Sequence, residues 1–242
     1  MTTRASRFAG LSLTLIRIGG LAVLLGALGY RLGIVGLGPA FGLFGIGFLL
    51  SLITLAFALI TVVVARHHPE VAKRAGLAAV LALAVVAVPV WAIVNGAGAP
   101  PIHQITTDTE DPPQYDAVIP LRGEDSNPLE YSSELAEVQR RAYPDIQSLL
   151  LSETPDEVFE RSVEIARALG WVIVNTDREA GRIEATDITF WFGFKDDVVV
   201  RIRPDDNGAR VDVRSVSRVG GGDVGANAAR IRAFSRRLAA SE

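Results

Sequence analysis

Residues 41–64 read FGLFGIGFLLSLITLAFALITVVV, a run of 24 residues without a charged side chain. About 20 apolar residues in a helix are enough to cross the hydrocarbon core of a bilayer, which is roughly 30 Å thick. Two further stretches have the same character, because residues 75–95 carry no charge and residues 11–32 carry only Arg17 and Arg31. The sequence therefore predicts a three-helix transmembrane region with spans over about residues 11–32, 41–64 and 75–95.

Arg17 constrains the position of the first span. An arginine at mid-membrane costs roughly 2.5–3.5 kcal/mol, so we expect Arg17 near one interface, with its side chain reaching the head groups. A cleaved signal peptide is the alternative for this segment, since it combines a basic start with an apolar core. The core is long, no A-x-A site follows it and a second apolar run comes next, which favours a retained helix.

Basic residues indicate the orientation of the three spans. Arg4 and Arg7 precede the first span. The link between the second and third spans contains Arg66, His67, His68, Lys73 and Arg74. Because Lys and Arg are retained on the cytoplasmic side, the amino terminus and this link are expected in the cytoplasm. The sequence thus predicts a multi-pass inner-membrane protein whose carboxyl-terminal part is periplasmic, or extracytoplasmic in a cell without a periplasm.

The composition changes after the third span. Up to residue 99 there are seven Lys and Arg residues and one acid, Glu70, whereas the remainder contains 17 Lys and Arg and 26 Asp and Glu. We divide the chain into a transmembrane region (1–99), a linker and extended strap (100–128) and a soluble domain (129–242). The chain has no cysteine, so the soluble part must be stabilised by its core without disulfides.

Helix and strand signals follow one another in the soluble part. Residues 129–143 and 226–240 are predicted helices, and a third begins at Thr154, where Glu157 completes a capping box. Four strand-like runs are joined by short turns rich in Gly, Asn and Asp, at residues 171–176, 182–192, 197–203 and 209–218. These signals predict an α+β soluble domain in which an antiparallel four-stranded meander sheet packs with helices.

Alternation along the last two strands predicts one apolar and one charged sheet face. Val198, Val200 and Ile202 share the apolar face, which we expect the helices to cover. The candidate anion-binding residues of the charged face are Arg182, Arg201, Arg203, Arg214 and Arg218. Such arginines can bind a phosphate or an anionic head group bidentately, or can form cross-strand ion pairs on a solvated face. The mixed charge and acidic balance argue against nucleic acid as a partner.

Several short motifs of the soluble part form a recognisable set. They are PIH at 101–103, TTD at 106–108, DPP at 111–113, YP at 143–144, GRIEAT at 181–186, WFGFKDD at 191–197, DVRSVSRVG at 212–220 and DxGxNxxRI at 223–231. Together they resemble the domain of unknown function 1499 family of bacterial and plastid proteins, over residues 101 to about 234. Gln104 and Gly222 stand where that family commonly has an acid and a serine. The resemblance supports the fold and implies no particular activity.

His103 is the only histidine of the soluble part, and Asp108 and Asp111 follow it closely. These three residues can form a general base or a metal site, or His103 can simply hydrogen-bond the strap to the domain. A single His without Cys fits no structural zinc pattern, so we expect neither a metal nor a cofactor. The chain is therefore interpreted as a membrane protein with a binding or interaction domain at the cell envelope. A membrane-anchored hydrolase that uses His103 is the alternative.

The expected partners follow from the same features. The bilayer surrounds the spans, and an anionic lipid head group or an envelope protein is the expected partner of the soluble domain. A glycine stripe at and just before the start of the second span contains Gly38, Gly42, Gly45 and Gly47. Small residues let membrane helices approach closely, either within the three-helix region or between two copies of the chain.

Overall fold

The structure is a computed structural model that describes residues 2–240. The chain separates into a helical unit, formed mainly by residues 1–95, and an α+β unit that begins at Gly96. The two units differ in what covers their apolar side chains. Many large apolar residues of the helical unit are exposed, whereas those of the α+β unit form a continuous buried core.

The helical unit consists of α1 (Thr2–Arg31), α2 (Leu37–Val64) and α3 (Pro69–Asn95). Each contains a stretch long and apolar enough to cross a membrane: Arg4–Arg31, Leu37–Val64 and Pro69–Trp91. The prediction of three long apolar helices is confirmed, and α1 extends in both directions around Arg17 as one helix.

Glycine brings α1 and α2 together at two points. A Cβ atom at Gly47 would overlap the carbonyl oxygen of Gly19, and one at Gly26 would lie 2.6 Å from the carbonyl oxygen of Ala40. A Cβ atom at Gly38 or Gly42 would meet no described atom within 4 Å. The expected packing within the unit is therefore confirmed for Gly47 and not for the Gly38–Gly42 part of the stripe.

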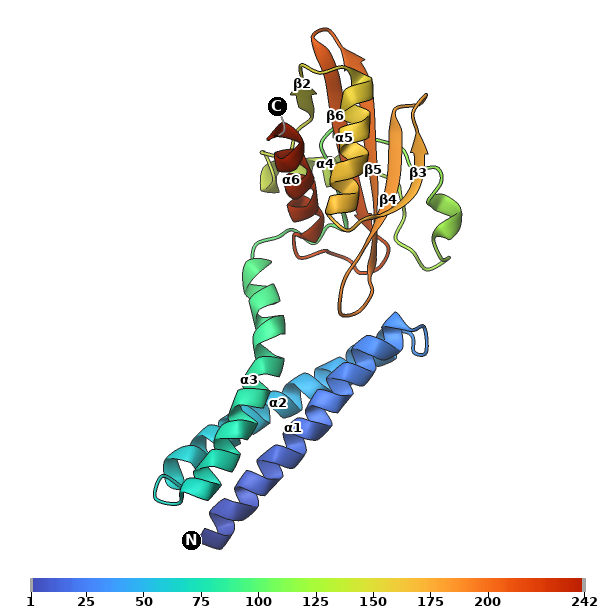
Figure 1. The fold of residues 1–242 in the computed structure, drawn as a ribbon. Helices are drawn as coiled ribbons and strands as arrows, with labels where there is room; N and C mark the ends of the chain where they lie inside the picture. The colour runs from blue at the N-terminus through green and yellow to red at the C-terminus, as the bar shows by residue number, and fades with distance from the viewer. Residues whose placement is uncertain (1, 241–242) are drawn as a thin grey trace. The chain divides into compact units, whose positions relative to one another are not determined.

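The α+β unit contains one antiparallel sheet with three α-helices and a short 3₁₀ helix, η1 (Ile119–Leu121) (Figure 1). The helices are α4 (Ser133–Ala142), α5 (Pro155–Ala168) and α6 (Ala226–Ala239). The strands are β1 (Gln104–Thr106), β2 (Leu149–Leu151), β3 (Val172–Asp177), β4 (Arg182–Ile188), β5 (Lys195–Asp205) and β6 (Gly208–Ser217). Their order is β1-β6-β5-β4-β3, and β2 also pairs with β6.

The sheet has six strands where the sequence predicts four. The predicted meander corresponds to β3–β6, and the two additional strands, β1 and β2, have three residues each. Both pair antiparallel with β6, at Gln104–Thr106 and at Leu149–Leu151. Strands this short show no alternation of polar and apolar residues, so the sequence carries no signal for them. The first predicted helix also begins later, because Ser132 caps the backbone N–H of Leu135.

One face of the sheet is covered by α5, which lies in front of β5 and β6 in Figure 1, and by α6, which packs against β6, β1 and β2. The predicted capping box at Thr154 and Glu157 is present at the start of α5, and Gly170 ends this helix with a φ of 85°. The predicted apolar face lies beneath these helices, with Val198 and Val200 in the main core.

The opposite face carries charged side chains, as predicted, and the strap packs over part of it. Tyr115 and Val118 of the strap form a second small core with Val199 and Val216 of the sheet. The buried carboxylate of Glu184 accepts hydrogen bonds from the backbone N–H groups of residues 116–118 at 3.0 Å each. The strap therefore determines which charged side chains of this face remain accessible.

Candidate functional site: an arginine and aspartate cluster

Strand register brings three arginines together at one end of the strap-covered face. In the β5–β6 pairing Arg201 lies opposite Asp212, and Arg203 lies opposite Arg210. Two arginines directly opposite one another repel, so this register is stable only when carboxylates lie between them. The sheet by itself supplies Asp212, and the remaining acids come from the strap.

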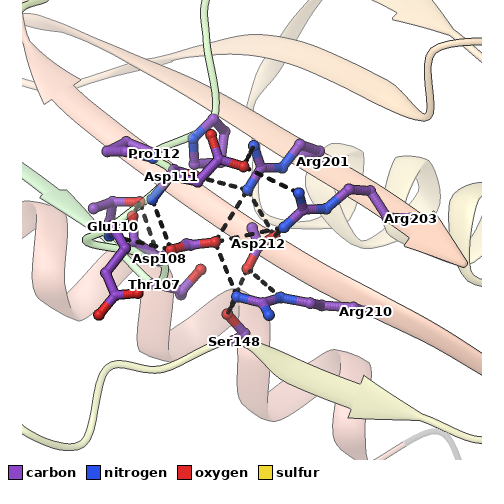
Figure 2. Close-up of polar contacts among 12 residues, drawn as sticks. Thr107, Asp108, Glu110, Asp111, Pro112, Ser148, Arg201, Arg203, Arg210 and Asp212 are labelled. Carbon is purple, nitrogen blue, oxygen red and sulfur yellow. Dashed lines mark hydrogen bonds and ion pairs between the residues drawn. The ribbon is translucent and has the colours of Figure 1, made fainter. Parts of the chain in front are cut away.

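The strap contributes Asp108 and Asp111 to the same place (Figure 2). One carboxylate oxygen of Asp108, Oδ2, accepts hydrogen bonds from Arg201 at 3.2 Å and Arg210 at 2.9 Å, with Arg203 at 3.5 Å. Its other oxygen accepts the backbone N–H groups of Glu110 and Asp111 at 3.2 and 3.0 Å. Asp108 thus fixes both the turn of the strap and the positions of the guanidinium groups.

Asp212 and Ser148 form the floor of the cluster. The Oδ2 atom of Asp212 accepts hydrogen bonds from Arg201 at 3.0 Å and Arg203 at 2.9 Å. The hydroxyl of Ser148 donates to Oδ1 of Asp212 at 2.5 Å and accepts from Arg210 at 3.0 Å. We call this group of seven side chains the arginine cluster: Arg201, Arg203, Arg210, Asp108, Asp111, Asp212 and Ser148.

Exposure increases from the floor of the arginine cluster to its outer edge. The side chains of Asp212 and Asp108 are 0% and 9% exposed, whereas those of Arg210 and Arg203 are 36% and 39% exposed. Asp111 is the outermost member, with 64% of its side chain exposed. Two guanidinium groups therefore present part of their surface to solvent above two buried carboxylates.

The electrostatic environment favours the charged forms of Asp212 and Arg210. Burial alone would raise the pKa of Asp212, but the hydrogen bond from Ser148 and the charges of Arg201 and Arg210 bring it below its ordinary value. Burial would lower the pKa of Arg210, and Asp212 and Asp108 reverse that effect and raise it. The floor is consequently an anion at neutral pH, and the arginines above it are cations.

Arg214, predicted to bind an anion, is buried elsewhere under the strap. Its guanidinium donates hydrogen bonds to Gln104 at 2.7 Å, to the carbonyl oxygen of Pro113 at 3.1 Å and to that of Leu129. The same group lies over the rings of Tyr115 and Tyr131, 5.3 and 5.7 Å from their centroids. Burial lowers the pKa of Arg214. This residue attaches the strap to the sheet.

Arg218 and Arg182 likewise have partners inside the domain. Arg218 binds the fully buried carboxylate of Asp197 at 2.8 Å, where Arg122 of the strap binds as well. Arg182 lies 2.7 Å from Asp116 and 3.3 Å from Glu184. All five predicted arginines are on the same sheet face, but of these only Arg201 and Arg203 belong to the arginine cluster.

His103 does not lie in the arginine cluster with Asp108 and Asp111, the two acids that follow it closely in the sequence. Asp108 and Asp111 bind arginines of the cluster, whereas the backbone oxygen of His103 accepts from Ser217 at 2.8 Å and Asn227 at 3.1 Å. Burial lowers the pKa of the His103 imidazole, an effect opposed by its hydrogen bond to the backbone of Pro128. Its Nε2 atom is buried and has no hydrogen-bond partner within the described residues. This geometry fits the interpretation of His103 as a residue that anchors the strap.

Metal ligation receives no support from this arrangement. Across residues 2–240, no group of three or more His, Cys, Asp or Glu side chains is placed to hold a metal ion. Asp108, Asp111 and Asp212 are close together, but arginine nitrogens occupy the space between them (Figure 2). The cluster is thus suited to anions rather than to cations.

Three members of the cluster, Arg210, Asp212 and Ser148, are not among the candidate residues named from the sequence. Arg210 has the same alternation as Arg214 and was a detectable candidate for the charged face. Ser148 precedes the three-residue strand β2, and no local pattern indicates that its hydroxyl meets Asp212.

Comparison with known proteins identifies the family of the α+β unit. Residues 104–238 match the family described as "Protein of unknown function (DUF1499)". No curated protein matches the sequence. The match covers more than half of the chain and includes every strand of the sheet and the whole arginine cluster. The chain belongs to the DUF1499 family.

Proposed function

We propose that this DUF1499 protein displays its α+β domain outside the cytoplasm, where the arginine cluster binds an anionic group of the cell envelope. The observation that carries the proposal is the convergence of Arg201, Arg203 and Arg210 at one partly exposed position. Three guanidinium groups face two buried carboxylates, Asp108 and Asp212, which leaves an excess of one positive charge beneath the outermost acid.

Guanidinium chemistry defines the class of ligand. Planar N–H groups match the oxygen atoms of carboxylates and phosphates, and a pair of arginines held at a fixed spacing favours these oxyanions over halide ions. Phosphate can be supplied by a lipid head group or as a free phosphate ester, so both sources have to be tested. The short distances between the guanidinium groups and their acids support a site in which the arginines are already held in place when a ligand arrives.

Binding can be measured with the full chain in nanodiscs of zwitterionic phosphatidylcholine. Isothermal titration calorimetry with inorganic phosphate, dihexanoyl phosphatidylglycerol and dihexanoyl phosphatidylcholine separates a free phosphate site from a head-group site. Arg203→Gln should weaken binding of the preferred anion about tenfold, the effect of losing roughly 1.4 kcal/mol from one charge-assisted contact. Arg178→Gln is the matched control, because Arg178 forms exposed ion pairs on the other side of the domain, with Asp156 and Glu160.

The proposal is refuted if Arg203→Gln and the wild-type chain bind phosphate and phosphatidylglycerol with equal affinity. Binding to phosphatidylcholine as strong as to phosphatidylglycerol would show recognition of the acyl chains and would also refute it. Equal weakening by Arg203→Gln and Arg178→Gln would point to the net charge of the surface rather than to the cluster.

The orientation of the chain is the second part of the proposal. Support comes from the basic link between α2 and α3, which contains Arg66, Lys73 and Arg74, and from the three candidate spans. With the amino terminus and this link in the cytoplasm, Glu242 lies outside. An alkaline phosphatase fusion at Glu242 should therefore be active in a bacterial host, and a green fluorescent protein fusion at the same position dark. The reverse pattern would overturn the orientation.

Pairing of two copies in the membrane is proposed from the outer part of the glycine stripe. Gly38 and Gly42 are exposed on α2, one turn apart, and neither is used in packing against α1. Close approach of a second helix at this position would use the small-residue mode of membrane helix association.

The hydrolase alternative receives less support. A hydrolytic site built on His103 requires an acid to orient the imidazole, and Asp108 and Asp111 are bound by arginines instead. We therefore favour a binding function over catalysis by these residues.

A further inference from the structure

Asp111 occupies the outer position of the arginine cluster in the way a bound ligand would. Its Oδ2 atom accepts one hydrogen bond from Nη1 of Arg201 and another from Nη1 of Arg203, each 3.0 Å long. The side chain is 64% exposed, so its carboxylate reaches the two guanidinium groups from the solvent side. Asp108 and Asp212, by contrast, contact the arginines from below and are at least nine-tenths buried.

The backbone around Asp111 is fixed independently of its carboxylate. The N–H group of Asp111 donates to Asp108 at 3.0 Å, and its carbonyl oxygen accepts from Arg201 at 2.7 Å. Pro112 and Pro113 follow directly, and the carbonyl oxygen of Pro113 is held by the buried Arg214. Rotation of the Asp111 side chain about its χ1 and χ2 angles is therefore enough to free the two guanidinium groups, while the strap stays in place.

We infer that Asp111 is an internal ligand that occupies the anion site, and that the external ligand is an oxyanion, either a carboxylate or a phosphate group, which replaces its carboxylate. The inference rests on the proposed function and specifies its ligand. The entering group places one oxygen between Nη1 of Arg201 and Nη1 of Arg203, where Oδ2 of Asp111 lies now. No covalent bond is made or broken in the exchange.

Charge balance explains why a ligand and Asp111 are interchangeable. With Asp111 in place, three arginines and three aspartates neutralise one another; with its side chain rotated away, one positive charge faces solvent beside Arg203. Exposed ion pairs contribute little to stability, so a ligand with a comparable charge and better geometry can compete. Loss of the competing carboxylate should tighten binding about two- to fivefold, on the scale of one solvent-exposed ion pair.

The test compares Asp111→Asn with Glu110→Gln in the full chain, in phosphatidylcholine nanodiscs. Each substitution removes one negative charge from neighbouring positions of the strap. Only Asp111 contacts the arginines; the Glu110 side chain is directed away from them (Figure 2). Calorimetric titrations with acetate, inorganic phosphate, dihexanoyl phosphatidylglycerol and dihexanoyl phosphatidylcholine then give the affinity and the source of the oxyanion.

The expected result is about two- to fivefold tighter binding of acetate or phosphate by Asp111→Asn, with Glu110→Gln close to wild type. Equal tightening in both variants would show a general effect of charge and overturn the inference. Binding by the wild-type chain that Asp111→Asn does not change would overturn the inference and leave the proposed function standing. Absence of binding in the wild-type chain, in Asp111→Asn and in Asp111→Ala, with unchanged melting temperatures, would overturn both.

Discussion

Replacement of Glu184 by glutamine tests how the strap is fixed above the sheet. The Glu184 carboxylate is 0% exposed and accepts the backbone N–H groups of residues 116–118, each at 3.0 Å. Glutamine has nearly the same shape, but one of its two terminal groups donates hydrogen bonds. At least one of the three N–H groups therefore loses its acceptor, and Arg182 loses its ion pair with Glu184 at 3.3 Å.

The size of the effect follows from these contacts. A buried donor left without an acceptor costs about 1–3 kcal/mol. Arg182 keeps its ion pair with Asp116 and is partly exposed, so the loss of its contact with Glu184 adds little. For a domain of this size, 1 kcal/mol corresponds to roughly 2–4 °C in melting temperature. Glu184→Gln should therefore lower the melting temperature of the α+β domain by about 2–12 °C.

The assay is thermal unfolding of the full chain in detergent, followed by tryptophan fluorescence. Trp171 reports on the core of the domain because it is 5% exposed and stacks on Phe234 at 5.4 Å between ring centroids. Glu179→Gln, on the exposed turn before β4, is the control that removes the same charge. Amide hydrogen exchange of residues 116–118 should become faster in Glu184→Gln. A loss below about 2 °C, with unchanged protection of these amides, would refute the reasoning.

Three further predictions concern other parts of the chain. Burial lowers the pKa of His103 below 6.5 in the folded chain, so the unfolded chain takes up the proton first and stability should fall as the pH drops through 6.5. His103→Gln should therefore reduce the change in melting temperature between pH 7.5 and 5.5. If the variant keeps the wild-type dependence on pH, His103 is not the source of that dependence. Gly47→Leu should lower the thermal stability of the helical unit, measured by circular dichroism in detergent, because the new side chain would meet the backbone of Gly19. Gly42→Leu should leave that stability unchanged and should reduce cross-linking between copies of the chain. Equal effects of the two substitutions on thermal stability would contradict this packing. Asp197→Asn leaves two buried arginines, Arg122 and Arg218, without their carboxylate, and should destabilise the domain by about 3–5 kcal/mol in urea titrations. A variant as stable as the wild-type chain would contradict this prediction.

Much of the architecture was predictable from local sequence signals. The three apolar runs, the capping box at Thr154, the glycine stop at Gly170 and the four longer strands each depend on residues near one another in the chain. These signals fixed the fold class and the sheet face beneath the helices. The two three-residue strands could not be predicted in this way, because their only determinant is pairing with β6, far along the chain.

The candidate site was predictable only in part. Alternation correctly placed Arg201 and Arg214 on one sheet face, but it carried no information about what covers that face. Val199 and Val216 are the residues that indicate that another segment covers the charged face. Both are apolar residues on that face, and both are fully buried against the strap. The strap buries Arg214 and leaves Arg201 closer to solvent. This difference depends on contacts between residues about a hundred positions apart in the sequence, such as Arg214 with Gln104 and Arg201 with Asp108.

The pairing of the strap with β6 has a consequence for the time course of synthesis. Gln104 is made early and Arg214, its partner, follows 110 residues later. At about 5–20 residues per second, that interval lasts on the order of 5–20 s. During this time Gln104, Asp108 and Asp111 have been synthesised, whereas the strand that they bind has not been translated. An unfolded segment with little hydrophobic character stays soluble until its partner strand has been synthesised. The acidic, proline-rich composition of the strap therefore suits the part of the domain that must remain unfolded longest.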